Sequence, residues 1–285
     1  MSVAASAALR TPIPRPVNLN ALPVIVGSAL LVLAGCASGF DGSGRFLDVA
    51  GGQVHVWCDG DRGPTVVFLS GIGGDDTLVP IAERISDDAV ACFYHRPGDG
   101  DTERPSGPRT AAGDAADLHE LLAAAEIETP AVLVGHSYGG LIALIAAAEH
   151  PEETAGIVLV DASEPGAEET MYAVMTDAQR AYFDGRLADF PYVDWPTSLD
   201  QGREAMLRFP DVPLTVITAT RSFLDPCDPE LPCEQLQPIW LDAQDRYAEL
   251  TSGARHILAD TSHYVHNDDP DLVEQEIREL LANLD

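Results

Sequence analysis

The stretch Ala131-Val-Leu-Val-Gly-His-Ser-Tyr-Gly-Gly140 decides the fold. It begins as an apolar strand, turns sharply at Gly-x-Ser-x-Gly, and continues into an Ala-rich helix expected over residues 139–150. At such a strand–turn–helix junction the serine adopts a strained backbone, so its neighbours must be small, and three glycines of this stretch meet that demand. The turn predicts that Ser137 is a nucleophile at a helix N-terminus, where the helix dipole favours developing negative charge.

Strands and helices alternate along the rest of the chain. After a hairpin of residues 45–49 and 54–58, strands are predicted over 64–69, 89–94, 131–134, 156–160, 213–219 and 256–259. Helices are predicted over 78–85, 111–125, 139–150, 236–250 and 272–284. Repeated strand–helix units whose strands are apolar on both faces predict an α/β fold, with a mostly parallel sheet and helices on both sides.

Composition narrows the classes of function. Of the 285 residues, 46% are hydrophobic and 22% are charged, as in ordinary globular proteins. The 16 basic residues, all of them Arg, face 46 acidic residues, so the formal net charge is −30. This excess of acid argues against a nucleic-acid partner, because neutralising phosphates requires Lys or Arg. It also argues against electrostatic docking to anionic lipid.

The first 35 residues have the pattern of a signal peptide. A leader with two Arg precedes an apolar run over residues 21–35, which is shorter than the roughly 20 residues that a membrane span needs. The run ends in Leu33-Ala34-Gly35-Cys36, which resembles the lipobox of bacterial lipoproteins. This resemblance implies cleavage before Cys36, lipidation of its thiol and a tether over residues 36–44.

The leader therefore predicts an exported protein at the cell surface or facing the periplasm, held at the membrane only through its lipid. An ordinary secreted protein and an uncleaved anchor are the alternatives. Export would let the other cysteines form disulfides. Cys58 and Cys92 lie in two predicted strands, while Cys227 and Cys233 bracket a short loop. We expect the pairs 58–92 and 227–233, with buried free thiols as the alternative.

No group of His and Cys has the spacing of a zinc site, so neither a metal nor a cofactor is expected.

Over residues 45–285 the chain resembles the serine hydrolases of the α/β-hydrolase fold. Besides the turn at Ser137, Tyr94-His-Arg-Pro-Gly-Asp-Gly100 is similar to the family's Tyr-Asp-Arg-x-Gly-x-Gly turn, with His95 in place of Asp. The resemblance implies that the second strand lies beside the fourth, which favours the pair Cys58–Cys92.

Leu69-Ser-Gly-Ile-Gly-Gly74 follows the third strand, where this family carries its first oxyanion-hole loop. Ser70 stands where the family often has His. The resemblance implies that the backbone N–H groups of Ile72 and Tyr138 form the oxyanion hole.

The base is expected in the segment from Asp260 to Pro270, which is similar to the family's catalytic-histidine loop. His263 aligns with the base, and His266 is the alternative. His136, beside the nucleophile, is expected to be a packing residue rather than a second base.

The acid of the triad has three candidates, because related families place it after the sixth or the seventh strand. Asp161 stands at the tip of the sixth strand, whereas Asp225 comes late after the seventh. We prefer Asp161, with Asp225 and then Glu164 as alternatives. The acid would orient the His263 tautomer and stabilise the imidazolium.

Residues 164–212 interrupt the alternation and are expected to form a cap over the site. Their Met and aromatic side chains indicate an apolar acyl or alcohol pocket, or else the cap's own small core. Their acidity disfavours anionic substrates.

Two classes of function follow. The first is a serine hydrolase that cleaves a small-molecule carboxylic ester or amide through an acyl-enzyme. The second is a catalytically inert binding lipoprotein on the same scaffold.

Overall fold

The computed structural model describes residues 44–221 and 228–284. The chain divides into two units, Met1–Ala37 and Ser38–Asp285, and all of the described residues belong to the second. Within the described residues, no helix is both long enough and apolar enough to cross a membrane.

Several sequence predictions fall outside the described residues. They are the signal peptide, the lipidation site Cys36, the alternative acid Asp225, and the pair 227–233, of which Cys227 is not described. These stay predictions.

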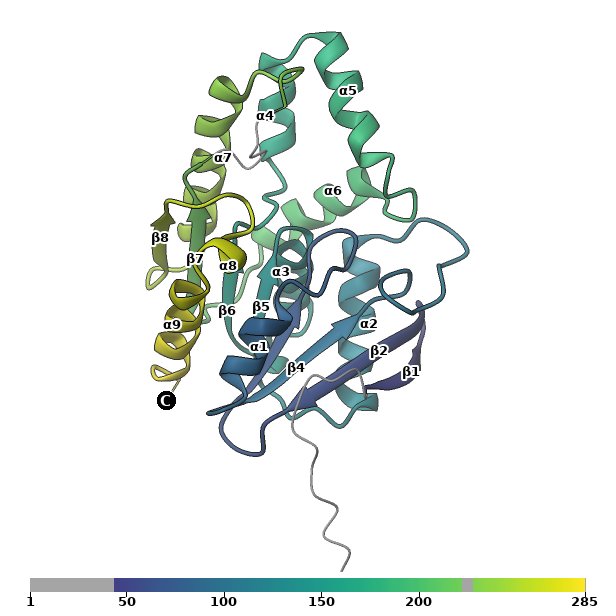
Figure 1. Ribbon diagram of the computed structural model, residues 1–285, viewed down its shortest axis with the longest axis vertical. Helices are drawn as coiled ribbons and strands as arrows, with labels where there is room; N and C mark the ends of the chain where they lie inside the picture. Colours follow the sequence, from purple (N-terminus) through teal and green to yellow (C-terminus); the bar gives the residue numbers. More distant parts are fainter. Residues whose placement is uncertain (1–43, 222–227, 285) are drawn as a thin grey trace, which may run out of the picture. The chain divides into compact units, whose positions relative to one another are not determined.

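The described strands form one eight-stranded sheet in the order β1-β2-β4-β3-β5-β6-β7-β8 (Figure 1). The strands are β1 Arg45–Val49, β2 Gly52–Asp59, β3 Thr65–Leu69, β4 Val90–His95, β5 Ala131–His136, β6 Thr154–Val160, β7 Leu214–Ala219 and β8 Arg255–Ala259. Strand β2 runs antiparallel to both of its neighbours, and every pair from β4 to β8 is parallel. The predicted α/β-hydrolase fold with a mostly parallel sheet is confirmed.

Two hydrophobic cores lie on the two faces of this sheet. One packs α2 (Ala111–Ala124) and α3 (Tyr138–Glu149) against it, and the other packs α1 (Val79–Ile85) and α9 (Pro270–Leu281). Because both faces are covered, β3, β5 and β7 are buried along their whole length, which explains their continuous apolar runs.

Helix α3 is apolar on nearly every side, as expected for a helix enclosed by other elements.

Between β6 and β7 the chain forms three helices: α4 Ala167–Val174, α5 Asp177–Leu187 and α6 Trp195–Met206 (Figure 1). They occupy the segment predicted as a cap. A Thr176 capping box begins α5, and the Asp194 side chain caps α6. The remaining helices are η1 Pro151–Glu153, α7 Cys233–Ala248 and α8 Val265–Asp268.

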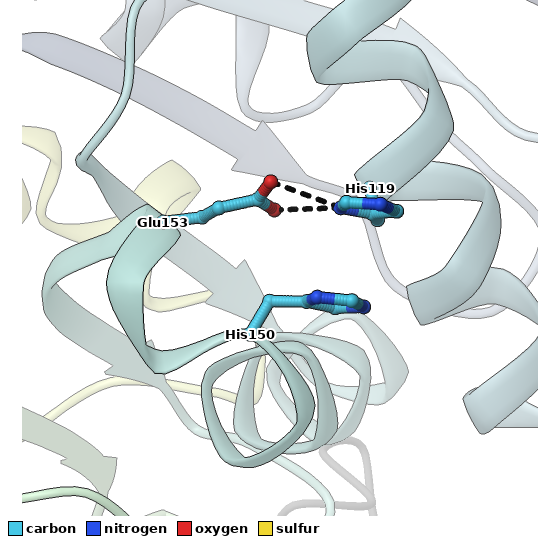
Figure 2. A group of neighbouring side chains, drawn as sticks. All are labelled: His119, His150 and Glu153. Carbon is cyan, nitrogen blue, oxygen red and sulfur yellow. Dashed lines mark hydrogen bonds and ion pairs between the residues drawn. The ribbon is translucent and has the colours of Figure 1, made fainter.

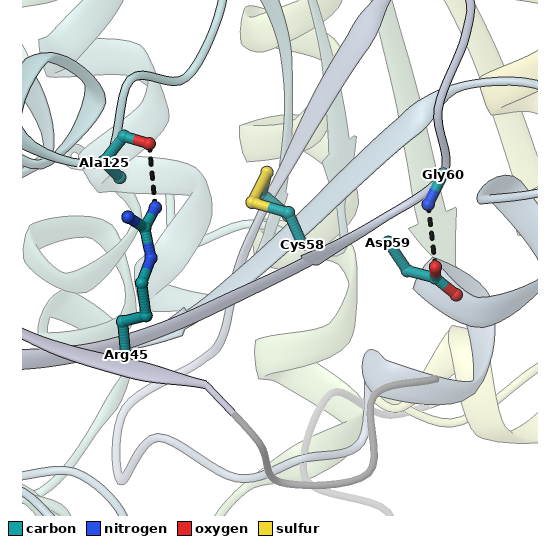
Figure 3. Close-up of a disulfide and its surroundings, with 6 residues drawn as sticks. Arg45, Cys58, Asp59, Gly60 and Ala125 are labelled. Atoms are coloured by element: carbon teal, nitrogen blue, oxygen red, sulfur yellow. Dashed lines mark hydrogen bonds between the residues drawn. A yellow bond between two sulfur atoms is a disulfide. The ribbon is translucent and has the colours of Figure 1, made fainter. Parts of the chain in front are cut away.

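Cys58 and Cys92 form the disulfide that was expected from their strands (Figure 3). They stand directly opposite each other in the antiparallel register of β2 and β4. Nearby, Arg45 on β1 donates from Nη2 to the Ala125 carbonyl at 2.9 Å, which ties the edge of the sheet to the end of α2.

Candidate active site

Ser137 occupies the sharp turn between β5 and α3. Its φ of 51° and ψ of −120° are rare for a residue other than glycine and cost of order 1–3 kcal/mol. The surrounding backbone holds this conformation. The Ser137 N–H donates to the Val160 carbonyl at 3.3 Å, and its own carbonyl accepts from the Gly140 and Ser163 N–H groups, both at 3.0 Å.

The glycines of the turn are required by close backbone approach. A Cβ added to Gly135 would lie 2.6 Å from the Gly140 Cα. One added to Gly139 would lie 2.2 Å from the Leu69 carbonyl oxygen. The strand, the turn and the oxyanion loop can therefore pack together only if these positions carry no side chain.

Asp161 follows β6 directly and its side chain is fully buried beside His263. Its Oδ2 lies 2.6 Å from His263 Nδ1. Its Oδ1 accepts from the Ala219 N–H at 3.0 Å and from Trp240 Nε1 at 2.8 Å. The protein thus offers three hydrogen-bond partners to one carboxylate, so both oxygens of this buried group are satisfied.

The Asp161 contact fixes the orientation of the His263 ring. With Nδ1–H donating to the carboxylate, Nε2 is the nitrogen available to take up a proton. Ser137 and His263 both line one cavity. Among the described residues no hydrogen bond joins the Ser137 hydroxyl to His263, and in enzymes without substrate this contact often tightens only on binding.

The described alternatives to these residues are engaged elsewhere. His266 Nε2 lies 2.8 Å from the Thr77 hydroxyl, and burial lowers the pKa of His266 to about 3. Glu164 is buried and accepts from Arg246 Nε at 3.0 Å and Nη2 at 2.5 Å. Asp225 lies outside the described residues.

His136 supports the loop that carries His263. Its Nε2–H donates to the His263 carbonyl at 3.1 Å, and its ring centroid is 4.6 Å from that of His263. Burial lowers the pKa of His136 far below its usual value, so its ring stays neutral. The packing role fits the expectation, but the hydrogen bond across 127 positions has no local signal in the sequence.

Arg96 holds the oxyanion loop and was not singled out by the sequence reasoning. It is buried and donates to the Ser70 carbonyl at 2.7 Å and to the Gly71 carbonyl at 2.6 Å. Asp99 Oδ2 lies 2.9 Å from Arg96 Nη2 as a buried counter-ion. With these carbonyls fixed, the next residue of the loop, Ile72, lines the cavity together with Tyr138.

The cavity has a volume of about 720 Å³ and runs from Ser137 to the cap helices. Its apolar walls are formed by Ile72, Ala167, Met171, Phe183, Leu187, Phe190, Trp195, Leu199 and Trp240. Glu168 also lines it, accepting from Trp195 Nε1 at 2.5 Å, and burial raises the pKa of Glu168. Side chains of the predicted cap segment therefore line the cavity as well as packing in a small core of their own.

Among the described residues, the one group of His, Cys, Asp or Glu side chains close enough together to share a metal ion lies outside this cavity, at His119, His150 and Glu153.

The alpha/beta hydrolase family matches residues 66–276, and the chain belongs to that family. It is 24% identical over 219 residues to the uncharacterized protein YqjL of Bacillus subtilis strain 168, which covers 75% of this chain and 82% of that protein. Three further curated relatives match over 15%, 6% and 37% of their own length; the last of these is the putative carbamate hydrolase RutD of Escherichia coli O1:K1, which is 33% identical over 100 residues.

Two solved structures share the fold. The enol-lactonase from Burkholderia xenovorans LB400 is 21% identical with a TM-score of 0.59, over 84% of this chain and all of that one. The esterase RhEst1 from Rhodococcus sp. ECU1013 is also 21% identical, with a TM-score of 0.60, over 85% of this chain and all of that one.

Proposed function

We propose that this protein is a serine hydrolase that cleaves carboxylic esters through an acyl-enzyme. The observation that carries the proposal is the buried Asp161 carboxylate against His263 Nδ1, with the strained Ser137 turn opening into the same cavity. An inert scaffold has no need for a buried acid aligned on a partly exposed histidine. Esterase and lactonase among the structural neighbours agree with this reaction.

In the proposed reaction the Ser137 Oγ attacks the ester carbonyl carbon while His263 Nε2 accepts the hydroxyl proton. The backbone N–H groups of Ile72 and Tyr138 donate hydrogen bonds to the oxyanion of the tetrahedral intermediate and stabilise its negative charge. His263 then gives its proton to the departing alcohol, which leaves an acyl group on Ser137. Water, deprotonated by the same histidine, releases the acid and restores the serine.

The cavity favours a neutral substrate with an apolar acyl or alcohol group. Its volume lies within the range of about 300–1,000 Å³ typical of small-molecule sites. Its walls are mainly apolar or aromatic, and the acidic residues that line it outnumber the single arginine, Arg186. A carboxylate or phosphate on the substrate would be repelled there.

Labelling with a fluorophosphonate probe tests the nucleophile, and p-nitrophenyl esters of increasing acyl length test the substrate class. We expect the probe to attach to Ser137 and the esters to be hydrolysed, with His263→Gln as an inactive control that keeps Ser137. A folded wild-type protein that neither reacts with the probe nor hydrolyses any ester would favour the inert binding lipoprotein instead.

We also propose that the protein is exported and anchored through a lipid on Cys36. The support is in the sequence: the short apolar run ends in Leu-Ala-Gly-Cys, and a tether of small residues follows. Residues 36–44 would then connect the lipid to the hydrolase domain.

A further inference from the structure

A second cluster of polar side chains lies on the face of the sheet covered by α2 and α3. His119 comes from α2, His150 ends α3, and Glu153 belongs to η1 (Figure 2). One potential ligand atom from each of the three lies within 4.8 Å of the other two. Elements that are distant in sequence therefore bring two imidazoles and one carboxylate into one small group.

The three side chains are joined by a short polar contact and a ring stack. His119 Nδ1 lies 2.9 Å and 3.0 Å from the two Glu153 carboxylate oxygens. The His119 and His150 rings stack in parallel, with centroids 3.9 Å apart and planes 1° apart (Figure 2). A small hollow lined by all three residues, together with apolar side chains such as Leu118 and Leu122, adjoins the group.

This cluster is remote from the proposed active site. Ser137 precedes the first turn of α3 and His150 follows its last turn. Since a helix rises about 1.5 Å per residue, the 12 residues of α3 separate the two positions by about 18 Å. The catalytic proposal gives the cluster no role.

We propose that His119, His150 and Glu153 form a site for a divalent transition-metal ion of the Zn²⁺ type. Two imidazole nitrogens and one carboxylate oxygen are a donor set that Zn²⁺ accepts, with water completing the tetrahedron. Ligand atoms about 2.0–2.2 Å from one ion stand closer together than 4.8 Å. The nitrogen lone pairs of two parallel stacked rings do not converge, so one ring must first turn out of the stack to close the site.

A proton alone accounts for the cluster less well than a metal ion. One proton shared between His119 and Glu153 leaves His150 stacked on the pair, with its Nδ1 no nearer than 4.0 Å to the Glu152 carboxylate. A divalent ion would engage both rings and the carboxylate together once one ring has turned out of the stack.

The side chains are open enough for an ion to enter, because His119 is 43% exposed and His150 is 30% exposed. Bound metal would join α2 to the junction of α3 and η1. We therefore assign the site a stabilising role rather than a catalytic one.

The test uses untagged protein, since a histidine tag would itself bind the probe. Zn²⁺ is added to wild type and to the variants His150→Gln and Glu153→Gln, with Ca²⁺ and Mg²⁺ as hard-ion controls. His256→Gln is the matched variant, because His256 Nδ1 also lies beside a single carboxylate, Asp245, at 3.2 Å, and His256 belongs to the edge strand β8.

In wild type and His256→Gln we expect one Zn²⁺ per chain by calorimetry and a rise in Tm of roughly 5–10 °C at a hundredfold excess over Kd. The two site variants should bind at least about 100-fold more weakly, because even partners outside the ligand shell typically contribute about 10–100-fold. Ca²⁺ and Mg²⁺ should leave Tm unchanged.

Circular dichroism of the metal-free variants establishes that they fold, so weak binding cannot be mistaken for unfolding. The proposal is overturned if wild type shows no shift with Zn²⁺, or if all four proteins respond equally.

Discussion

Ser137 and Asp161 both adopt a backbone conformation that side chains other than glycine seldom take, with φ of 51° and 44°. In the described part of the chain only Glu126 shares this property. Such strain persists where the surrounding structure determines it, and it concentrates at functional sites. Each residue directly follows a buried parallel strand. The Ser137 side chain lines the cavity, while the Asp161 side chain lies buried against His263, which lines the same cavity.

Ser137→Ala should remove ester hydrolysis and leave the fold intact. Alanine retains the Cβ and the strained backbone but has no nucleophile, so kcat should fall by roughly a thousandfold or more if the triad acts as a unit. The melting temperature should stay within about 2 °C of wild type. Steady-state kinetics and calorimetry measure both, and turnover like that of wild type would refute the mechanism.

Asp161→Asn should keep the volume of the side chain but place an NH₂ donor where a carboxylate oxygen accepts from His263 Nδ1. The amide can favour the wrong His263 tautomer and cannot stabilise the imidazolium, so kcat should fall by up to about 10⁴-fold. Asp225→Asn is the matched variant, because it removes the same charge from the alternative acid, and it should keep nearly normal rates. A large loss at Asp225 with normal rates for Asp161→Asn would reverse the assignment.

His266 should make stability depend on pH. Its pKa is about 3 in the folded protein and near 6.5 when unfolded, so the unfolded chain binds the extra proton between these values. The contribution is therefore complete above pH 6.5 and is lost as the pH falls toward 3, by at most about 1.4 kcal/mol per pH unit.

Urea unfolding at pH 7 and at pH 4.5 tests this dependence. The loss of unfolding free energy should be smaller in His266→Gln, whose amide can still reach Thr77, than in wild type. His256→Gln, a change on β8, should behave as wild type does. Equal losses in all three proteins would contradict the role of His266.

The roles of residues in short motifs could be predicted from the sequence, whereas the roles of residues that depend on contacts distant in the chain could not. Ser137 and His263 each sit in a local pattern, and the structure brings them to one cavity. Arg96 lies in a motif too, but its function depends on where the Ser70 and Gly71 carbonyls fall. His119 and His150 come from separate helices, so no zinc-type spacing marks them.

At the scale of elements, the disulfide joins β2 to β4 and closes a loop that includes β3 and α1. Its cysteines are 34 positions apart, for which loop-closure entropy gives about 3–4 kcal/mol of stabilisation. The variant carrying both Cys58→Ala and Cys92→Ala should lose about that much unfolding free energy in urea. Reductant should destabilise wild type and have a much smaller effect on the variant.

Mass mapping without reductant provides the control for this prediction. It should recover the peptides of Cys58 and Cys92 as one linked species. Free thiols at both positions would contradict the pairing even if the variant proved unstable.

The parallel strands were predictable because burial on both faces demands apolar runs, which β3, β5 and β7 show without interruption.

The cap was recognised only as a break in the alternation of strands and helices. Its helix α5 has no buried residue, so its sequence carries no strong apolar periodicity, and its limits come from caps such as Thr176. Local capping and tertiary packing, rather than hydrophobic pattern, define these helices.

At the scale of the whole molecule, the net charge of −30 decides how the protein can be held at a membrane. An acidic chain is repelled by anionic lipid, and the apolar run over residues 21–35 is short of the roughly 20 residues that span a bilayer. If the protein is membrane-bound, the acyl chains on Cys36 must supply the attachment.

Cys36→Ser should therefore move esterase activity from the membrane fraction to the soluble fraction, or leave an unprocessed precursor, and should abolish incorporation of labelled fatty acid. The matched variant Cys233→Ser should stay lipidated and membrane-bound. A processed Cys36→Ser protein that remained in the membrane fraction would show that another part of the chain anchors it.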